Sequence, residues 1–272
     1  MLLAGFLFAL MNICVKYVAH IPTLEVVLFR SLFSIVVTYL MLKKKKLPLL
    51  GNNRKLLTLR GVAGCLGLIG SFYTLQNIPL ASAVTINYLS PFFTAILGIF
   101  MVQQRLRAVQ FVYFGIAIAG VLLLKGFDTR ISMFDLFIGI SAAFFSGLAY
   151  NIIALIRTSE HPLVIMFYFP LLTIPVAGIY CLFNWHQPLG MDWVFLLLIG
   201  IFTQGAQYYM TRAYQQANLA KVSSLNYLGV LYALGFGYFL FDEKLSSYSY
   251  LGIALILISV LFNINTKQKK GA

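Results

Sequence analysis

The residue whose type and position point most directly to chemistry is Arg30, which interrupts the apolar stretch EVVLFRSLFSIVV. If this stretch crosses a lipid bilayer, a charge near its middle costs about 2.5–3.5 kcal/mol even on a mild insertion scale. A guanidinium presents five N–H donors in a fixed fork, which suits a carboxylate. Two interpretations stay open. Arg30 anchors an anionic group in a cavity, or it locks the fold by contacting Glu25, backbone carbonyls or polar groups of a neighbouring helix.

Neutral polar and aromatic side chains interrupt the other apolar stretches. Such groups either line a cavity or form interhelical hydrogen bonds, which contribute about 0.6 kcal/mol on average in membranes. As a set they predict a polar and aromatic cavity that binds a substrate together with Arg30. These candidate substrate-binding residues are Asn12, Tyr73, Asn87, Tyr88, Ser90, Tyr150, Asn151, Gln204, Gln207, Tyr208, Asn226 and Tyr227.

Two further features indicate parts that move during function. Lys16 lies near the end of the first apolar stretch, and Glu25 lies near the start of the second. We expect these residues either to pair as a gate or, in the case of Lys16, simply to extend the ammonium group to the interface. Pro91 removes a backbone hydrogen bond from the helix that contains it, so it is a candidate hinge.

The composition places these residues in an integral membrane protein. Of the 272 residues, 61% are hydrophobic and 10% are charged, whereas soluble domains average about 45–50% apolar and about 25% charged residues. The net charge of +13 is concentrated between apolar stretches, which argues against nucleic-acid binding. No phosphate-binding loop or metal-ligand cluster is evident in the sequence, so we expect no cofactor and no metal. The cysteines, Cys14, Cys65 and Cys181, are expected to be buried thiols.

Several stretches are long and apolar enough to cross a bilayer as helices, which requires about 20 residues each. These ten stretches are residues 1–19, 24–42, 56–76, 80–102, 107–125, 134–156, 163–183, 192–213, 218–241 and 247–265. Lysine and arginine gather in alternate connections, as in the run Lys43–Lys46, and at the C-terminus. The positive-inside rule therefore predicts that both termini lie in the cytoplasm. The lysine run is expected to be a topology anchor near anionic lipid.

A duplication explains why the tripeptide NYL occurs twice. Asn226 lies 139 positions after Asn87, and the same offset pairs Gly61 with Gly200 and Asn12 with Asn151. The offset corresponds to five of the expected spans, and because five is odd, the second copy must enter the membrane from the opposite side. The fold class expected is therefore all-α, with ten transmembrane helices in two inverted five-helix repeats, residues 1–127 and 128–272. This symmetry is common in secondary transporters.

Four stretches of the sequence resemble a known protein family. The opening LFALMNICVKYVAH and PTLEVVLFRSLFS, and the two repeat ends NIPLASAVTINYLSPFFTAILGIFMVQQRL and QQANLAKVSSLNYLGVLYALGFGYFLFDEKL, resemble the EamA-type branch of the drug/metabolite transporter superfamily. The resemblance implies ten helices in two EamA domains. It also implies an acidic residue near the end of the fourth helix of each repeat. Glu243 fills this position in the second repeat, and Gln104 replaces it in the first. This asymmetry favours a role for Glu243 in helix capping or loop geometry.

These observations predict a secondary transporter in the cytoplasmic membrane. It would move a small polar metabolite, such as an amino acid, an amino-acid derivative or an S-adenosylmethionine-like compound, by alternating access. Two other classes stay open. A membrane-embedded lipid-modifying enzyme would need clustered catalytic residues at one interface, and a structural or regulatory subunit would have no mechanical use for an inverted repeat. We expect a non-enzyme whose partners are the metabolite and the lipid bilayer, with no nucleic acid.

Overall fold

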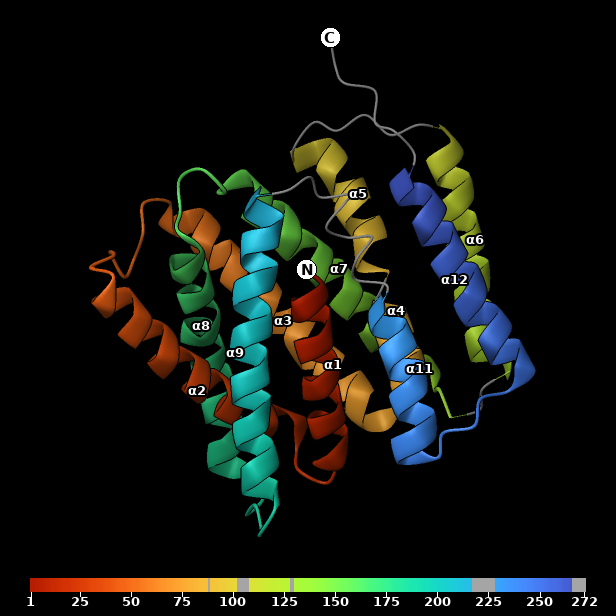
Figure 1. The fold of residues 1–272 in the computed structure, drawn as a ribbon, viewed down its shortest axis with the longest axis horizontal. Coiled ribbons are helices and arrows are strands. Elements are labelled where there is room, and N and C mark those ends of the chain that lie inside the picture. Colours follow the sequence, from red (N-terminus) through yellow and green to blue (C-terminus); the bar gives the residue numbers. More distant parts are fainter. Residues whose placement is uncertain (88, 102–107, 128–129, 217–227, 266–272) are drawn as a thin grey trace.

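A computed structural model describes residues 1–87, 89–101, 108–127, 130–216 and 228–265, and every regular element in these ranges is an α-helix. The helices form one elongated bundle, with their axes roughly along a common direction (Figure 1). Their bounds are α1 Leu2–Tyr17, α2 Thr23–Lys44, α3 Arg54–Asn77, α4 Leu80–Asn87, α5 Ser90–Met101, α6 Ala108–Phe127, α7 Met133–Leu155, α8 Pro162–Phe183, α9 Asp192–Gln216, α11 Leu228–Phe241 and α12 Ser247–Asn265.

Local sequence signals fix where several of these helices begin. At α7, the Ser132 hydroxyl accepts from the Asp135 N–H and the Asp135 carboxylate accepts from the Ser132 N–H, which is a capping box. At α3, the Asn53 side chain accepts from the Leu56 N–H. At α8, the His161 ring accepts from the N–H of Leu163, and Pro162 occupies the first turn, where its missing N–H is not needed.

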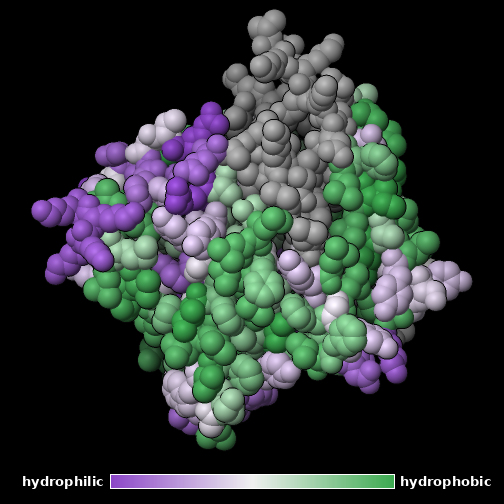
Figure 2. Space-filling view, in the orientation of Figure 1, coloured by the Kyte–Doolittle hydropathy of each residue, from purple (hydrophilic) through white to green (hydrophobic). Residues whose placement is uncertain are grey.

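The helices have the length and composition of membrane spans. Within the described ranges, six helical segments are long and apolar enough to cross a bilayer, and three shorter apolar helices accompany them. Large apolar side chains such as Phe100, Leu182 and Phe239 are about four-fifths exposed. Green, apolar surface covers most of the middle of the bundle in Figure 2. An all-α membrane fold is therefore confirmed, because lipid is the solvent in which such a surface is stable.

The two ends of the bundle differ in charge. We call the end that carries residues 45–53 and 156–161 the basic face, and the end that carries residues 18–22, 184–191 and 242–246 the opposite face. Purple, hydrophilic surface gathers at the upper left of Figure 2, over the end of α2 and the start of α3. The run Lys43–Lys46 lies there.

Helices of the two halves pack together in symmetric pairs. Helix α1 packs against α9, and the equivalent pair from the other half is α7 against α3. Helix α2 packs against α8, α4 against α11 and α6 against α12, each helix contacting its own counterpart. This pattern is the one that a two-fold axis between the halves produces, and inverted-topology repeats have such an axis.

Small residues allow the closest crossings between the halves. A Cβ added to Gly67 would lie 2.9 Å from the Ser146 Oγ, and one added to Gly70 would lie 2.9 Å from the Ala142 Cβ. Close packing through small residues replaces the hydrophobic driving force that is missing inside lipid. The crossing of α3 and α7 thus brings the polar side chains on their facing surfaces within reach of one another.

Candidate functional site

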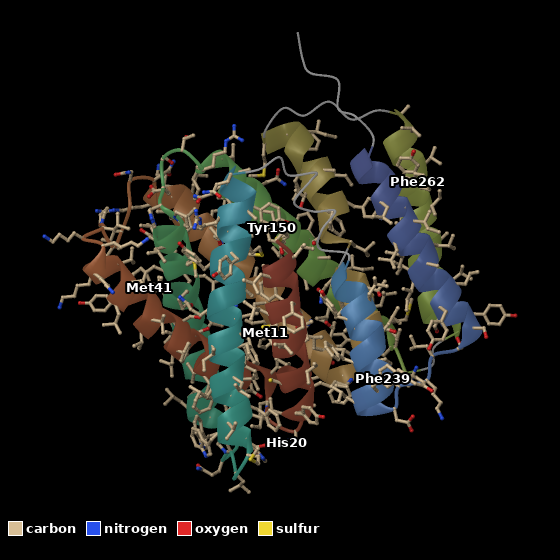
Figure 3. All side chains as sticks on the ribbon, in the orientation of Figure 1. Met11, His20, Met41, Tyr150, Phe239 and Phe262 are labelled. Carbon is tan, nitrogen blue, oxygen red and sulfur yellow. The ribbon has the colours of Figure 1, made fainter. Side chains whose placement is uncertain are left out.

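A cavity of about 200 Å³ lies between the two halves. Helices α1 to α5 contribute from the first half and α7, α8 and α9 from the second. Figure 3 labels Met11 and Tyr150, two lining residues from opposite halves, near the middle of the bundle. The polar lining residues are Asn12, Arg30, Arg60, Ser71, Asn87, Ser90, Ser146, Tyr150 and Gln207.

Arg30 reaches this cavity from α2 and is only 3% exposed. Its Nε donates to the Thr203 hydroxyl at 3.2 Å. Its guanidinium carbon lies 4.9 Å from the ring centre of Phe169 and 5.6 Å from that of Phe72. Its Nη1 is buried without a hydrogen-bond partner. The contact with Thr203 of α9 supports the interpretation as a structural lock, and the role of Arg30 as an anchor for an anionic group stays a prediction.

Arg60 is a functional candidate that sequence reasoning missed, because a basic residue near the start of a span is also what membrane topology requires. It lies in α3, lines the same cavity and is 2% exposed. Its guanidinium carbon lies 5.4 Å from the ring centre of Phe169, and its Nε and Nη1 have no hydrogen-bond partner. Helical periodicity was the available signal, since Arg60, Gly64, Gly67 and Ser71 follow one another at three- and four-residue spacing on one face.

The neutral polar candidates divide into two groups. Asn12, Asn87, Ser90, Tyr150 and Gln207 line the cavity. The Ser71 hydroxyl donates to the Asn87 side chain at 3.0 Å, and the Tyr150 ring stacks on Tyr214 with centroids 4.7 Å apart. These contacts orient an amide and a phenol at the wall of the cavity.

Other candidates hold helices together away from the cavity lining. The Asn151 Nδ2 donates to the Thr94 carbonyl at 2.9 Å, and the Gln204 Nε2 donates to the Thr38 hydroxyl at 2.9 Å. Tyr73 packs edge-on against Phe134. The expected equivalence of Asn12 and Asn151 therefore does not extend to their surroundings, because only Asn12 is among the lining residues.

The remaining candidates are Pro91, Tyr88, Asn226 and Tyr227. Helix α4 ends at Asn87 and α5 begins at Ser90, so Pro91 stands in the first turn of a new helix. The role of Pro91 as a hinge stays a prediction. Tyr88, Asn226 and Tyr227 lie outside the residues that the structure describes.

The expected pairing of Lys16 with Glu25 is wrong. The Lys16 Nζ lies 3.2 Å from the Glu243 Oε1 and donates to the Ile78 carbonyl at 2.7 Å. The Glu243 Oε2 accepts from the Leu80 N–H at 2.7 Å, so this carboxylate also caps α4. Glu25 instead accepts from the His186 N–H at 2.9 Å. The physical reason is the packing of α1 against α11, which brings a distant acidic residue closer to Lys16 than its neighbour in sequence.

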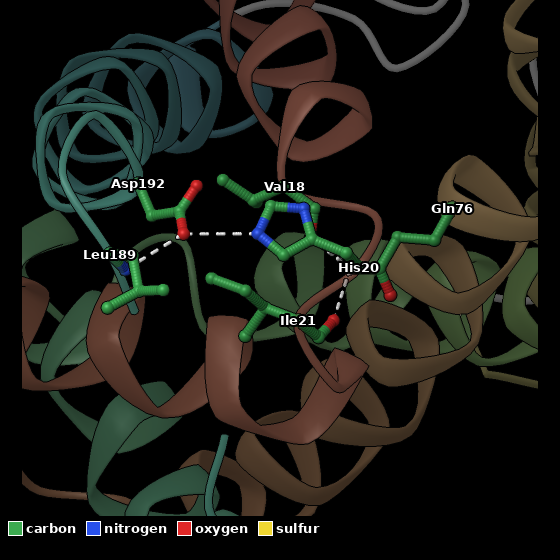
Figure 4. A network of polar contacts seen from close by, with 6 residues as sticks. All are labelled: Val18, His20, Ile21, Gln76, Leu189 and Asp192. Carbon is green, nitrogen blue, oxygen red and sulfur yellow. Dashed lines mark hydrogen bonds and ion pairs between the residues drawn. The ribbon is translucent and has the colours of Figure 1, made fainter. Parts of the chain in front are cut away.

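Further contacts join the halves at the opposite face. The His20 Nε2 lies 3.1 Å from the Asp192 Oδ2, which also accepts from the Leu189 N–H (Figure 4). In the same view, Gln76 reaches the loop after α1, where its Nε2 donates to the Ile21 carbonyl at 3.1 Å. The contact between His20 and Asp192 holds the loop after α1 against the start of α9, and Gln76 holds the same loop against α3.

The basic face has a matching set of contacts. The Glu160 Oε1 accepts from the N–H groups of Asn52 and Asn53, each at 2.6 Å. The Asn52 Nδ2 donates to the Ser159 carbonyl at 3.1 Å. The loop after α7 thus contacts the start of α3, which is the counterpart of the loop after α1 contacting the start of α9.

A second cavity of about 430 Å³ opens at the basic face, and Lys45, Arg157, His161, Tyr208 and Arg212 are among its lining residues. Tyr208 therefore lies at this cavity and not at the central one, with the Arg212 guanidinium carbon 5.8 Å from its ring centre. Burial, and to a lesser degree nearby Lys45 and Arg212, lowers the pKa of His161.

Acidification should weaken the start of α8, because protonated His161 no longer accepts from the Leu163 N–H. Since the folded-state pKa lies below the unfolded value near 6.5, this stabilisation is complete above about pH 6.5 and is lost as the pH falls through the folded-state pKa. The melting temperature between pH 8 and pH 5 should fall more steeply in the wild type than in His161→Asn, since asparagine caps without titrating. Equal slopes would contradict this role.

The fold and the central cavity define a multi-helix membrane transporter. The model of the EamA-like transporter family matches residues 1–125 and again residues 133–265. This chain belongs to that family.

Similar proteins carry transporter names. The pseudopaline exporter CntI of Pseudomonas aeruginosa is 28% identical over 269 residues, covering 98% of this chain and 95% of the exporter. Solute carrier family 35 member G1 of Homo sapiens is 26% identical over 260 residues, covering 89% of this chain and 71% of the carrier. A crystal structure with 17% identity matches with a TM-score of 0.67 over 97% of this chain and 95% of its own, which shows the fold alone.

Proposed function

We propose that this protein is a secondary transporter that binds a small polar metabolite in the central cavity and exposes it to each side of the membrane in turn. The observation that carries the proposal is a buried Arg30 with an unpartnered Nη1 in a cavity that both halves line. A site between inverted repeats is where secondary transporters bind their substrates. The names of the similar proteins, an exporter and a solute carrier, support transport of a solute.

Arg30 narrows the candidate substrates. A buried guanidinium with a free donor favours a carboxylate or another acidic group. The positive charge disfavours a purely cationic solute, so carboxylate-bearing amino acids and their derivatives fit this cavity better than an S-adenosylmethionine-like compound without a free carboxylate. Tyr150, stacked on Tyr214, supplies an aromatic wall beside the amides of Asn12 and Gln207.

The basic face gives the proposed orientation. We infer that it faces the cytoplasm, since Lys43–Lys46 and the exposed Arg54 and Lys55 all lie at that end of the bundle. An excess of lysine and arginine in short connections sets the orientation of multi-spanning proteins. A cytoplasmic membrane location with both termini inside follows from this assignment.

Counterflow in proteoliposomes tests the proposal. Proteoliposomes that contain the purified protein would be loaded with unlabelled amino acids or amino-acid derivatives, one compound at a time. Uptake of the same compound in labelled form would then be followed. Arg30→Met keeps an unbranched apolar side chain but removes the charge, and we expect it to lower uptake by about 10–100-fold, the value of one charge-assisted hydrogen bond. Lys55→Met, an exposed lysine in the first turn of α3, is the matched control and should leave uptake unchanged.

Two outcomes contradict separate parts of the proposal. Undiminished transport by Arg30→Met would remove this residue from the binding site while leaving the transporter assignment in place. If the folded wild type exchanged none of the metabolite classes, the transporter assignment itself would be lost.

A further inference from the structure

The central cavity holds two buried positive charges with no acidic residue among its lining residues. Arg30 and Arg60 both line it and are 3% and 2% exposed. The sequence has seven acidic residues, and Asp128 lies outside the described part of the chain. The other six have contacts elsewhere: Glu25 with the His186 N–H, Asp135 with Ser132, Glu160 with Asn52 and Asn53, Asp192 with His20, Asp242 with Lys244, and Glu243 with Lys16.

The two guanidiniums also keep donors free. The Nη1 of Arg30 and the Nε and Nη1 of Arg60 are buried without a hydrogen-bond partner. A buried charge is costly unless it is paired and hydrogen-bonded. A ligand with one negative charge would balance only one of the two positive charges in the cavity, whereas a ligand with two acidic groups would balance both.

The ring of Phe169 limits how far apart the two charges can lie. The guanidinium carbon of Arg30 is 4.9 Å from the ring centre and that of Arg60 is 5.4 Å from it, so the two carbons can be no farther apart than these distances added together. Gly64 holds Arg60 and the ring in place, because a Cβ there would lie 2.5 Å from the Arg60 Nη1 and 2.7 Å from the Phe169 Cδ2. Two acidic groups on one short carbon skeleton can therefore reach both guanidiniums.

We propose that the substrate carries two acidic groups, one held by Arg30 and the other by Arg60, the two guanidiniums that lie beside the ring of Phe169. This inference rests on the proposed transport function and names the substrate class of the same cavity. Arg60 is thereby a substrate-binding residue, and it has no acidic partner in a complex with a ligand that lacks the second acid.

Matched pairs of small compounds test the two-acid rule in the full-length protein purified in detergent. Glutamate against glutamine, and succinate against succinamate, differ only in whether the second acid is present. By titration calorimetry we expect each diacid to bind about tenfold or more tightly than its monoamide, the factor that a charge-assisted hydrogen bond provides. Arg60→Met should bring this ratio close to one while binding of the monoamide persists, and Lys55→Met should leave the ratio unchanged.

Several results would overturn the two-acid rule. Equal binding of diacid and monoamide by the wild type would do so, as would inorganic phosphate binding as tightly as the diacids, because separate small anions would then fill the two places. If Arg60→Met does not fold, the comparison within the wild type decides alone, and Gly64→Ala, which displaces Arg60, supplies the second variant. Counterflow of a metabolite with one acidic group, sensitive to Arg30→Met, would reject the rule and leave the proposed transport function standing.

Discussion

Replacing Glu243 with glutamine should make the central cavity accessible from the opposite face. This carboxylate joins three segments, because it pairs with Lys16 of α1 and accepts from the Leu80 N–H at the start of α4 while standing between α11 and α12 itself. The two side chains are 17% and 10% exposed, so the pair is largely shielded from water. Its loss should cost about 1.5–3 kcal/mol, the range for a hydrogen bond to a charged group, and favour the opened state by about tenfold or more.

Cysteine labelling measures this accessibility. Ser71→Cys, in a background with the three native cysteines replaced, would be treated with a membrane-impermeant maleimide from each side of sealed vesicles. We expect Glu243→Gln to speed labelling from the opposite face only. Asp242→Asn is the matched control, since its side chain is 87% exposed and its nearest charge, Lys244, is 3.9 Å away. Unchanged labelling in the glutamine variant would show that these contacts do not close that face.

Placing a larger side chain at Gly147 should separate α7 from α5. A Cβ there would lie 2.8 Å from the Phe93 Cβ and from the Thr94 N, and 2.9 Å from the Ser90 carbonyl oxygen. Two of these three atoms belong to the backbone and cannot turn away. Gly147→Ala should therefore lose about 1–3 kcal/mol of stability, the usual range for overpacking, and Gly147→Leu should lose more.

The same crossing contains a hydrogen bond that the larger side chain would break. The Asn151 Nδ2 donates to the Thr94 carbonyl at 2.9 Å, and moving α5 away would break this bond and leave Asn151 only its bond to the Gly147 carbonyl of its own helix. Thermal unfolding in detergent measures the loss. Gly178→Ala in α8 is the control, because nothing lies within 4 Å of a Cβ there and alanine favours helix. Similar melting temperatures for the two alanine variants would refute the close crossing.

Much of the fold could be predicted from the sequence because lipid imposes simple rules. An all-α fold with an inverted repeat is predicted by three features: the span length, the apolar composition and the offset that relates Asn12 to Asn151. These features depend on residues close in sequence or on symmetry.

The candidate site was less predictable because its contacts join distant segments. Arg30 was found, since a charge at mid-span is conspicuous. Arg60 was not, since a basic residue near a span end is also what membrane topology requires. The partner of Lys16 was assigned by proximity in sequence, whereas helix packing supplies Glu243 from the other half.

The contacts at the two faces have a mechanical consequence. His20 with Asp192 and Glu160 with Asn52 hold equivalent loop pairs at opposite ends of the bundle, and both sets are formed at once. Each joins one half to the other, so rotating the halves toward either opening must break one set while it can keep the other. Under the alternating access proposed above, the ratio of the two openings therefore depends on the difference between the strengths of the two sets and not on either alone. Weakening both equally would speed exchange without changing which side the protein prefers to face.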